Sequence, residues 1–187
     1  MTQSAVTLLS ATPVYASSRF SLHEERFATP DGEVQRPVIH HPGAVAIIAQ
    51  PDPDHLILVR QFRYPIRRWT LEIPAGTRVP GEDPQRTAVR ELQEEAGYSC
   101  ATLTELMRLF PAVGVSDEEL IIYRAGALTN VPAAPEHGEL VAPLIVACAD
   151  LPTLLAQGEL CDAKTIIALA LLGLRVDGRP AAGGGHG

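Results

Sequence analysis

Short apolar runs separated by turn-forming residues fill the first half of the chain, which is the pattern expected of β-strands. The pattern predicts strands across residues 5–48, where Asp31-Gly32 marks a hairpin turn between Phe20–Ala28 and Val34–His40. The turn sequence PDPD then separates two strongly apolar segments. The further strands that we expect are Gly43–Gln50, His55–Arg63, Trp69–Ile73, Ala101–Phe110, Leu120–Leu128 and Leu140–Val146.

Capping residues delimit one helix in the middle of the chain. Asp83 is a favourable N-cap, Pro84 suits the first helical position, and Gly97 is a typical stop after Ala96. The preceding residues 74–82 are rich in glycine and proline and are expected to form a loop. The pattern therefore predicts an α/β (α+β) fold, a mixed β-sheet core flanked by helices. Two more helices are expected at Ala149–Gln157 and at Asp162–Leu174.

Length and charge narrow the classes of protein that remain. The 187 residues suit one domain with a small N-terminal extension, and the Gly-rich tail from Gly178 is expected to be disordered. The net charge of −7 argues against a nucleic-acid surface, which needs a basic stripe. No apolar run approaches the ~20 residues of a membrane span. Three widely spaced cysteines without a CxxC pattern indicate reduced thiols in a cytoplasmic protein.

Three carboxylates on the central helix point to a metal site. Glu91, Glu94 and Glu95 are spaced i, i+3 and i+4, so they share one helix face and repel one another. Arg90 can pair with Glu94, but Glu91 and Glu95 still need a cation. Carboxylates are hard oxygen ligands suited to Mg²⁺ or Mn²⁺, and Mg²⁺ commonly shares its shell with substrate phosphates. The helix therefore predicts metal-assisted hydrolysis at phosphorus.

The segment around these carboxylates resembles the Nudix box. Residues 76–98 fit the pattern G-x5-E-x7-R-E-U-x-E-E-x-G-U, in which U is apolar and Tyr98 fills the last position with an aromatic ring. The segments LEIPAG, QFR and GELCDAKTIIALALL look like those of the ADP-ribose pyrophosphatase branch of Nudix hydrolases. The resemblance covers roughly residues 17–174. The positions that match the box are Gly76, Glu82, Arg90, Glu91, Leu92, Glu94, Glu95, Gly97 and Tyr98.

The resemblance implies a site that holds two or more Mg²⁺ or Mn²⁺ ions. The family's pattern places metal ligands at Ala75, through its main-chain carbonyl, and at Glu91, Glu95 and the later loop residue Glu139, with Glu94 as a further box carboxylate. Glu82 either binds metal or anchors the loop. The family's general base is a glutamate two residues before the loop ligand, and His137 stands at that position here. The catalytic set that we expect is Glu94, Glu95, Glu139, His137 and Glu136.

The same resemblance places substrate groups more loosely. Arg36 and Arg63 match arginines that hold phosphates and the adenine side, and an arginine fork suits phosphate oxygens. Phe20 lies where an aromatic side chain stacks on adenine, often from the partner subunit, and Gly114 is a further substrate-binding candidate. This chain departs from the branch at Val113, where a proline is common.

The function that we expect is hydrolysis of a nucleoside diphosphate sugar, foremost ADP-ribose to AMP and ribose 5-phosphate. GDP-mannose, a dinucleotide or NADH is an alternative substrate, and a nucleotide-sugar sensor without turnover is a third possibility. By resemblance, residues 1–42 form a strand or hairpin region that dimerises, residues 43–175 form a Nudix-type α/β/α sandwich, and residues 176–187 form a flexible tail. The expected partners are a small nucleotide sugar and a second copy of the chain, without nucleic acid or membrane.

Overall fold

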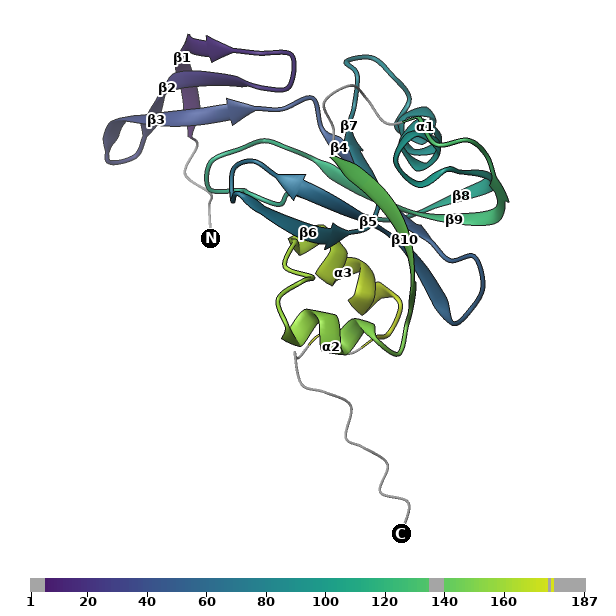
Figure 1. Cartoon of the computed structure of the whole chain (residues 1–187). Helices are drawn as coiled ribbons and strands as arrows, with labels where there is room; N and C mark the ends of the chain where they lie inside the picture. The colour runs from purple at the N-terminus through teal and green to yellow at the C-terminus, as the bar shows by residue number, and fades with distance from the viewer. Residues whose placement is uncertain (1–5, 135–139, 175, 177–187) are drawn as a thin grey trace.

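The computed structural model describes residues 6–134, 140–174 and 176 (Figure 1). Three of the expected catalytic residues, Glu136, His137 and Glu139, lie outside these described residues, as does the whole glycine-rich tail from Gly178. The elements are β1 Thr7–Ala16, β2 Ser21–Thr29, β3 Gly32–His40, β4 Ala44–Ala49, β5 His55–Arg63, β6 Arg68–Glu72, β7 Ala75–Thr77, α1 Pro84–Ala96, β8 Tyr98–Leu109, β9 Leu120–Asn130, β10 Val141–Ala147, α2 Leu151–Ala156 and α3 Ala163–Leu171.

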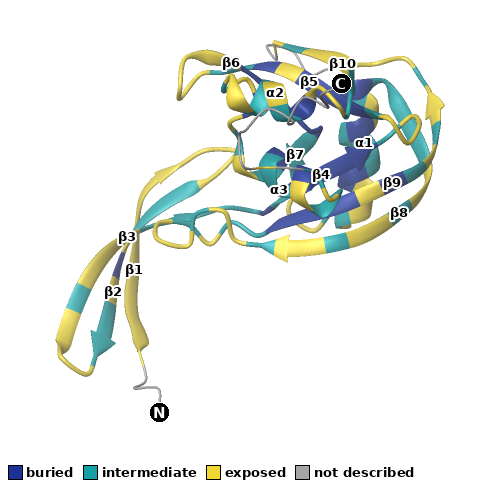
Figure 2. Cartoon of the chain, turned by 90° about the horizontal axis from the view of Figure 1, so that it is seen from below, coloured by how far each residue is buried: buried dark blue, intermediate teal, exposed yellow. Residues whose placement is uncertain are grey.

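The first three strands form a separate antiparallel sheet in the order β1-β2-β3. The predicted hairpin is present, with Thr29 paired to Gly32 across its turn. Strand β1 adds a third strand, which the sequence had not delimited within residues 5–48. This N-terminal sheet projects from the rest of the molecule as an arm, and most of its side chains are exposed (Figure 2).

Two further sheets form the body of the protein. One has the order β10-β5-β6 and the other β7-β4-β9-β8, in which β4 runs parallel to β9 and its other pairings are antiparallel. Strand β7 corrects the expectation of a loop over residues 74–82, because Ala75–Thr77 pairs with Ala44–Ala46. A segment of three residues is too short to show a strand pattern in the sequence. This strand forms because it pairs with the edge of β4 that β9 does not occupy.

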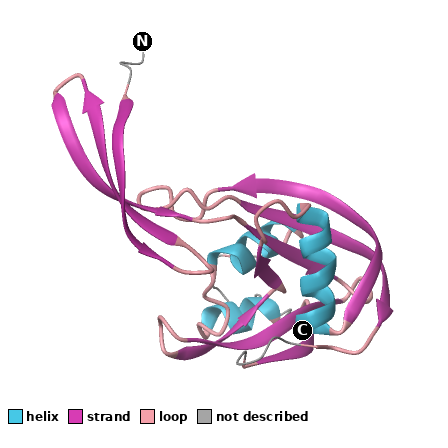
Figure 3. Cartoon of the chain, turned by 90° about the horizontal axis from the view of Figure 1, so that it is seen from above, coloured by secondary structure: helices cyan, strands magenta, loops and turns pink. Residues whose placement is uncertain are grey.

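Helices cover both faces of these sheets. Along β4, Val45 and Ile47 pack with Ala88 and Leu92 of α1, whereas Ala46 and Ile48 belong to the cluster formed with α2 and α3. Alternate side chains of a strand point to opposite faces, so this division shows one helical layer on each side (Figure 3). The predicted α+β sandwich with a mixed sheet is confirmed.

Helix α1 begins and ends where its capping residues predict. The Asp83 side chain accepts a hydrogen bond from the Gln85 amide at 2.9 Å, and Gly97 closes the helix at φ 72°, a left-handed conformation that glycine adopts without strain. Leu92 is fully buried, which fixes the rotation of the helix and therefore the direction of its acidic face. Within the described residues, none of the helices has the length and apolar character needed to cross a membrane.

Candidate active site

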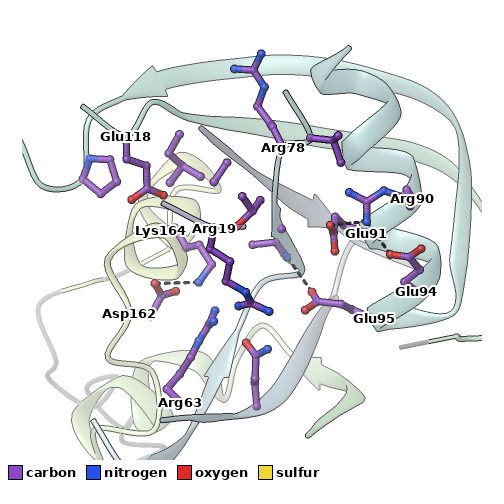
Figure 4. A pocket seen from close by; sticks show the side chains of 18 of the residues that line it. Arg19, Arg63, Arg78, Arg90, Glu91, Glu94, Glu95, Glu118, Asp162 and Lys164 are labelled. Atoms are coloured by element: carbon purple, nitrogen blue, oxygen red, sulfur yellow. Dashed lines mark hydrogen bonds and ion pairs between the residues drawn. The ribbon is translucent and has the colours of Figure 1, made fainter. Parts of the chain in front are cut away.

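A cleft of about 700 Å³ lies beside α1, β7 and the start of α3. Its wall joins residues from distant parts of the sequence, from the β1–β2 turn to the first turn of α3 (Figure 4). The charged residues that line it are Arg19, Arg63, Arg78, Arg90, Glu91, Glu94, Glu95, Glu118, Asp162 and Lys164.

The three box carboxylates of α1 line one side of the cleft together. Arg90 lies between two of them, with its Nη1 at 2.8 Å from Glu91 Oε1 and 2.8 Å from Glu94 Oε2. Partial burial lowers the pKa of Arg90, but the two carboxylates outweigh this effect and raise it. Arg90 therefore remains a cation that offsets the repulsion within the cluster. Its pairing with Glu94 confirms the sequence prediction, whereas its contact with Glu91 was not predicted.

Glu95 is the most enclosed of the three carboxylates. Only 4% of this residue is exposed, and its Oε2 accepts a hydrogen bond from the Ala75 amide at 3.0 Å. This bond ties α1 to β7 and fixes the peptide on which Ala75 sits. Ala75 and Glu95 are thus held against each other at the cleft, where the resemblance places both as metal ligands.

Gly76 allows Glu91 to approach β7 closely. A Cβ atom on residue 76 would lie 1.9 Å from Glu91 Cδ and 2.0 Å from Glu91 Oε1, far inside van der Waals contact. The first glycine of the box is therefore needed for space at this position, because the Glu91 carboxylate occupies the volume of a side chain.

Glu82 has the geometry of a loop anchor. Its Oε2 accepts a hydrogen bond from Thr87 Oγ1 at 2.9 Å and lies 3.7 Å from Arg90 Nη2. Thr87 is fully buried, so these contacts fasten the loop before α1 to the helix itself. Glu82 is not among the residues that line the cleft.

A buried carboxylate organises the basic side of the cleft. Arg63 binds Glu72 through two hydrogen bonds, from Nε at 2.8 Å and from Nη2 at 2.6 Å, and Lys164 Nζ contacts the same carboxylate. Lys164 also lies 3.0 Å from Asp162. Burial alone would raise the pKa of Glu72, but the hydrogen bonds from Arg63 and the charge of Lys164 lower it to about 2. Glu72 therefore stays ionised and orients both cations.

The remaining sequence candidates are spread over the molecule. Arg63 lines the cleft, whereas Phe20, Arg36 and Gly114 are exposed and are not among its lining residues in this single chain. Arg36 lies on the N-terminal sheet and donates to the carbonyl of its neighbour Gln35 at 2.8 Å. Phe20 lies in the β1–β2 turn beside Arg19, which does line the cleft, and Arg36 lies on β3 of the projecting sheet.

Sequence reasoning missed three cations of the cleft, Arg19, Arg78 and Lys164. Arg19 is adjacent to Phe20, but only the turn between β1 and β2 brings it to the body of the protein. Lys164 carried a usable signal, since a cation in the first turn of a helix opposes the helix dipole and needs a nearby carboxylate. The N-cap Asp162 and the buried Glu72 are those carboxylates.

The donor set of the cleft fits a hard divalent cation. Glu91, Glu94 and Glu95 supply carboxylate oxygens, and the peptide of Ala75 adds a main-chain carbonyl beside them. Oxygen ligands of this kind suit Mg²⁺ and Mn²⁺, and no softer ligand type is present among the charged residues that line the cleft.

Comparisons with known proteins give the same family from both sequence and structure. A family model described as the NUDIX domain matches residues 39–169. The chain is 35% identical over 165 residues to an ADP-ribose pyrophosphatase of Bacillus subtilis (strain 168), covering 87% of this chain and 89% of that protein. It is 32% identical over 165 residues to a methanol dehydrogenase activator of Bacillus methanolicus, with the same coverage of 87% and 89%. A crystal structure of an ADP compounds hydrolase matches with a TM-score of 0.76 and 27% identity, covering 90% of this chain and 92% of that chain.

Proposed function

This chain belongs to the NUDIX domain family, and we propose that it hydrolyses the pyrophosphate bond of ADP-ribose, which gives AMP and ribose 5-phosphate. The observation that carries this proposal is the composition of the cleft, in which the carboxylates of α1 face a set of cations across one cavity. A diphosphate suits a cleft with both kinds of side chain, because its oxygens bind metal ions held by carboxylates and also accept hydrogen bonds from arginine or lysine.

Members of this family are generally dependent on divalent metal ions. Glu91, Glu94, Glu95 and the carbonyl of Ala75 would hold Mg²⁺ or Mn²⁺, with two or more ions in the site. Such ions withdraw charge from the phosphate, orient it and make a hydroxide available near neutral pH. Gly76 and Arg90 support this role, the first by giving Glu91 room and the second by offsetting repulsion among the glutamates.

On the opposite side, Arg63, Lys164 and Arg19 would bind the diphosphate. Glu72 holds Arg63 and Lys164 in place, so their donors are oriented before the substrate arrives. This preorganisation limits the side-chain entropy that binding must overcome. Phe20, Arg36 and Gly114 do not line the cleft of their own chain but would still contact the substrate. Phe20 would do so by stacking on the adenine.

A panel of substrates with Mg²⁺ and with Mn²⁺ tests the proposal. ADP-ribose is expected to give AMP with a higher kcat/KM than GDP-mannose, a dinucleotide or NADH. A clear preference for one of those three would replace the proposed substrate and keep the reaction. Binding of ADP-ribose without turnover of any compound would instead identify a sensor and refute the proposed hydrolysis.

The expected general base lies outside the described residues, so it is tested by kinetics. His137 stands at the position of the family's base, with Glu136 beside it and Glu139 as a loop metal ligand. Glu139→Gln is expected to lower kcat strongly with little change in substrate affinity, as for a contact made mainly in the reacting state. His137→Gln is expected to remove the acidic limb of the pH–rate profile. An unchanged profile would leave Glu136 or metal-bound hydroxide as the base.

The division of the chain remains part of the proposal. Residues 1–42 would form the dimerisation region and residues 43–175 the catalytic domain, a boundary close to residue 39 at which the family match begins. A homodimer would bring Phe20 of one copy to the cleft of the other. The cytoplasmic location stays a prediction, which cell fractionation tests.

A further inference from the structure

A second group of metal-type side chains lies in the N-terminal sheet. His23 and Glu25 stand on β2, and His40 ends β3. In the register of the two strands His23 is opposite Val38 and His40 is opposite Ser21, so all three side chains project from the same face of the sheet. One ligand atom from each lies within 4.8 Å of the other two.

The His40 ring is held between two carboxylates. Its Nε2 lies 2.9 Å from Glu25 Oε1, and its Nδ1 lies 2.6 Å from Asp117 Oδ2. Histidines that bind metals characteristically give their second ring nitrogen to a carboxylate or carbonyl, which fixes the tautomer and the ring orientation. Asp117 supplies that partner by accepting a hydrogen bond from Nδ1–H. Without a metal ion, Nε2–H donates to Glu25, so an ion bound at Nε2 would have to replace this proton.

Glu25 is unusually enclosed for a carboxylate on a projecting sheet. Only 6% of this residue is exposed, and burying an ionised carboxylate is costly unless a cation or hydrogen-bond donors accompany it. Its cross-strand neighbour Arg36 is exposed and donates to the Gln35 carbonyl. The His23 ring packs edge-on against the His40 ring with the centroids 4.7 Å apart, so two imidazoles adjoin the buried carboxylate.

We propose that His23, Glu25 and His40 form a second metal site, distinct from the box carboxylates, which takes a first-row transition ion such as Zn²⁺. Two imidazole nitrogens and one carboxylate are a common zinc ligand set, with a water in the fourth position. Metal–ligand distances of about 2.0–2.2 Å place neighbouring ligand atoms roughly 3.3 Å apart, so small side-chain rotations close the observed group around an ion. If His40 carries a proton on Nε2, the ion replaces it and the proton passes to solvent.

The position of the group indicates a structural role. Asp117 belongs to the segment that returns to β3, where the Asp117 amide donates to the Ile39 carbonyl at 3.1 Å and the His41 amide donates to Asp117 Oδ1 at 2.8 Å. The next residue, Glu118, lines the cleft. An ion bound to His40 would therefore brace the N-terminal sheet against the segment that carries Glu118.

Calorimetric titration of the full chain with Zn²⁺ tests the proposal. The buffer contains millimolar Mg²⁺, which occupies the hard oxygen sites, and no nucleotide is present. One equivalent of Zn²⁺ is expected to bind and to raise the melting temperature. His23→Gln, Glu25→Gln and His40→Gln should each weaken binding at least tenfold, and Asp117→Asn by about 10- to 100-fold. The matched control is His55→Gln, because His55 is a partly exposed histidine that pairs with Asp52 at the start of β5, outside the N-terminal sheet, and its loss should change nothing.

Two outcomes would overturn the proposal. The first is that the wild type does not bind zinc, or that His23→Gln binds it as tightly as the wild type. The second is binding that is lost in the double variant Glu91→Gln/Glu95→Gln, which would assign the ion to the box carboxylates. His23→Gln decides the question if Glu25→Gln fails to fold, since His23 is only half-buried. Co²⁺ gives an independent readout, because its visible absorption should change with imidazole ligands in the wild type and not in His23→Gln.

Discussion

The three carboxylates of α1 differ in how far they are enclosed. The Glu94 side chain is 27% exposed and that of Glu91 is 12% exposed, whereas Glu95 is 4% exposed and bound to the Ala75 amide. A ligand that is already fixed loses little side-chain entropy when a metal ion binds. Glu95 is therefore the residue at which removing a charge should affect catalysis most directly.

Glu95→Gln is expected to lower kcat at least about 100-fold, a loss of roughly 3 kcal/mol of transition-state stabilisation. A neutral amide is a poor ligand for a hard cation, but its oxygen can still accept the hydrogen bond from Ala75. The melting temperature should therefore hold or rise slightly, because repulsion with Glu91 disappears. Steady-state kinetics and thermal unfolding of the purified variant check both parts.

The control is Glu105→Gln, which removes an exposed carboxylate paired with Arg108 on β8 and should leave turnover unchanged. Near-normal activity in a well-folded Glu95→Gln protein would refute the metal role of this residue.

Gly76→Ala tests whether the position of Glu91 depends on the absent side chain. The added methyl group would lie 2.0 Å from Glu91 Oε1, so the carboxylate must move by more than 1 Å to restore contact distance. Displacements of that size in an active site cost roughly 100-fold in rate. Stability should change little, because Glu91 can rotate away. Activity measured against Mg²⁺ concentration should reach its half-maximum at a higher Mg²⁺ concentration than in the wild type, and an unchanged curve would contradict this account.

Residue-scale chemistry could be predicted where it is encoded locally. Glu91, Glu94 and Glu95 follow from helical spacing, and the pairing of Arg90 with Glu94 follows from the same periodicity. The cation Arg19 could not be found in this way, because the turn that carries it reaches the cleft only through the path of the whole N-terminal sheet. The same holds for the role of Glu72, which depends on two strands and a helix that meet in the folded chain.

At the scale of elements, Glu72 fastens β5, β6 and α3 to one another. Its carboxylate binds Arg63 of β5 and Lys164 of α3 and accepts a hydrogen bond from Thr70 at 2.6 Å. Because the pKa of Glu72 is lowered to about 2 from its ordinary value of 4.5, the folded state favours the ionised form. The contribution of this group to stability is therefore full above about pH 4.5 and is lost as the pH falls toward 2.

Comparison with Glu72→Gln isolates that contribution. The shift from 4.5 to about 2 corresponds to about 3 kcal/mol of pH-dependent stability. We expect the free energy of unfolding of the wild type to exceed that of the variant most strongly at neutral pH. This difference between the two proteins should decrease by about 3 kcal/mol between pH 5 and pH 2. Urea unfolding at several pH values measures it. Parallel curves for the two proteins would refute the assignment.

Elements were predictable in proportion to their local signals. Helix α1 could be predicted because Asp83, Pro84 and Gly97 mark its two ends. The apolar strands β4 and β5 could be predicted because both are buried on two faces. Strand β7 could not, since three residues paired with β4 have no pattern of their own. Strand β8 begins at Tyr98, directly after the helix stop, whereas the sequence suggested Ala101. Its first residues are placed by pairing with the end of β9.

At the scale of the whole molecule, the N-terminal sheet exposes apolar side chains in a way that is unusual for a monomeric protein. Every residue of β1 is exposed, and large apolar side chains of this region face solvent, among them Leu8, Leu9, Val14 and Tyr15. Strand β1 is also an edge of its sheet, with unpaired backbone groups along one side. Exposed apolar side chains on an edge strand favour an interaction surface, and a small sheet of this kind is marginal alone.

The chain is therefore expected to be a homodimer assembled through the N-terminal sheet. Sedimentation at micromolar concentration should give a species of twice the 20.0 kDa chain mass. The double variant Leu8→Glu/Val14→Glu places charges on β1 and should shift the equilibrium at least tenfold toward the monomer. Ile66→Glu is the matched control, because it adds a charge to an equally exposed apolar residue in the turn between β5 and β6. If Phe20 acts across the dimer, the monomeric variant should also show a raised KM for ADP-ribose that recovers at high protein concentration. A wild-type monomer would contradict the assembly, and it would remove Phe20 from the partner's cleft.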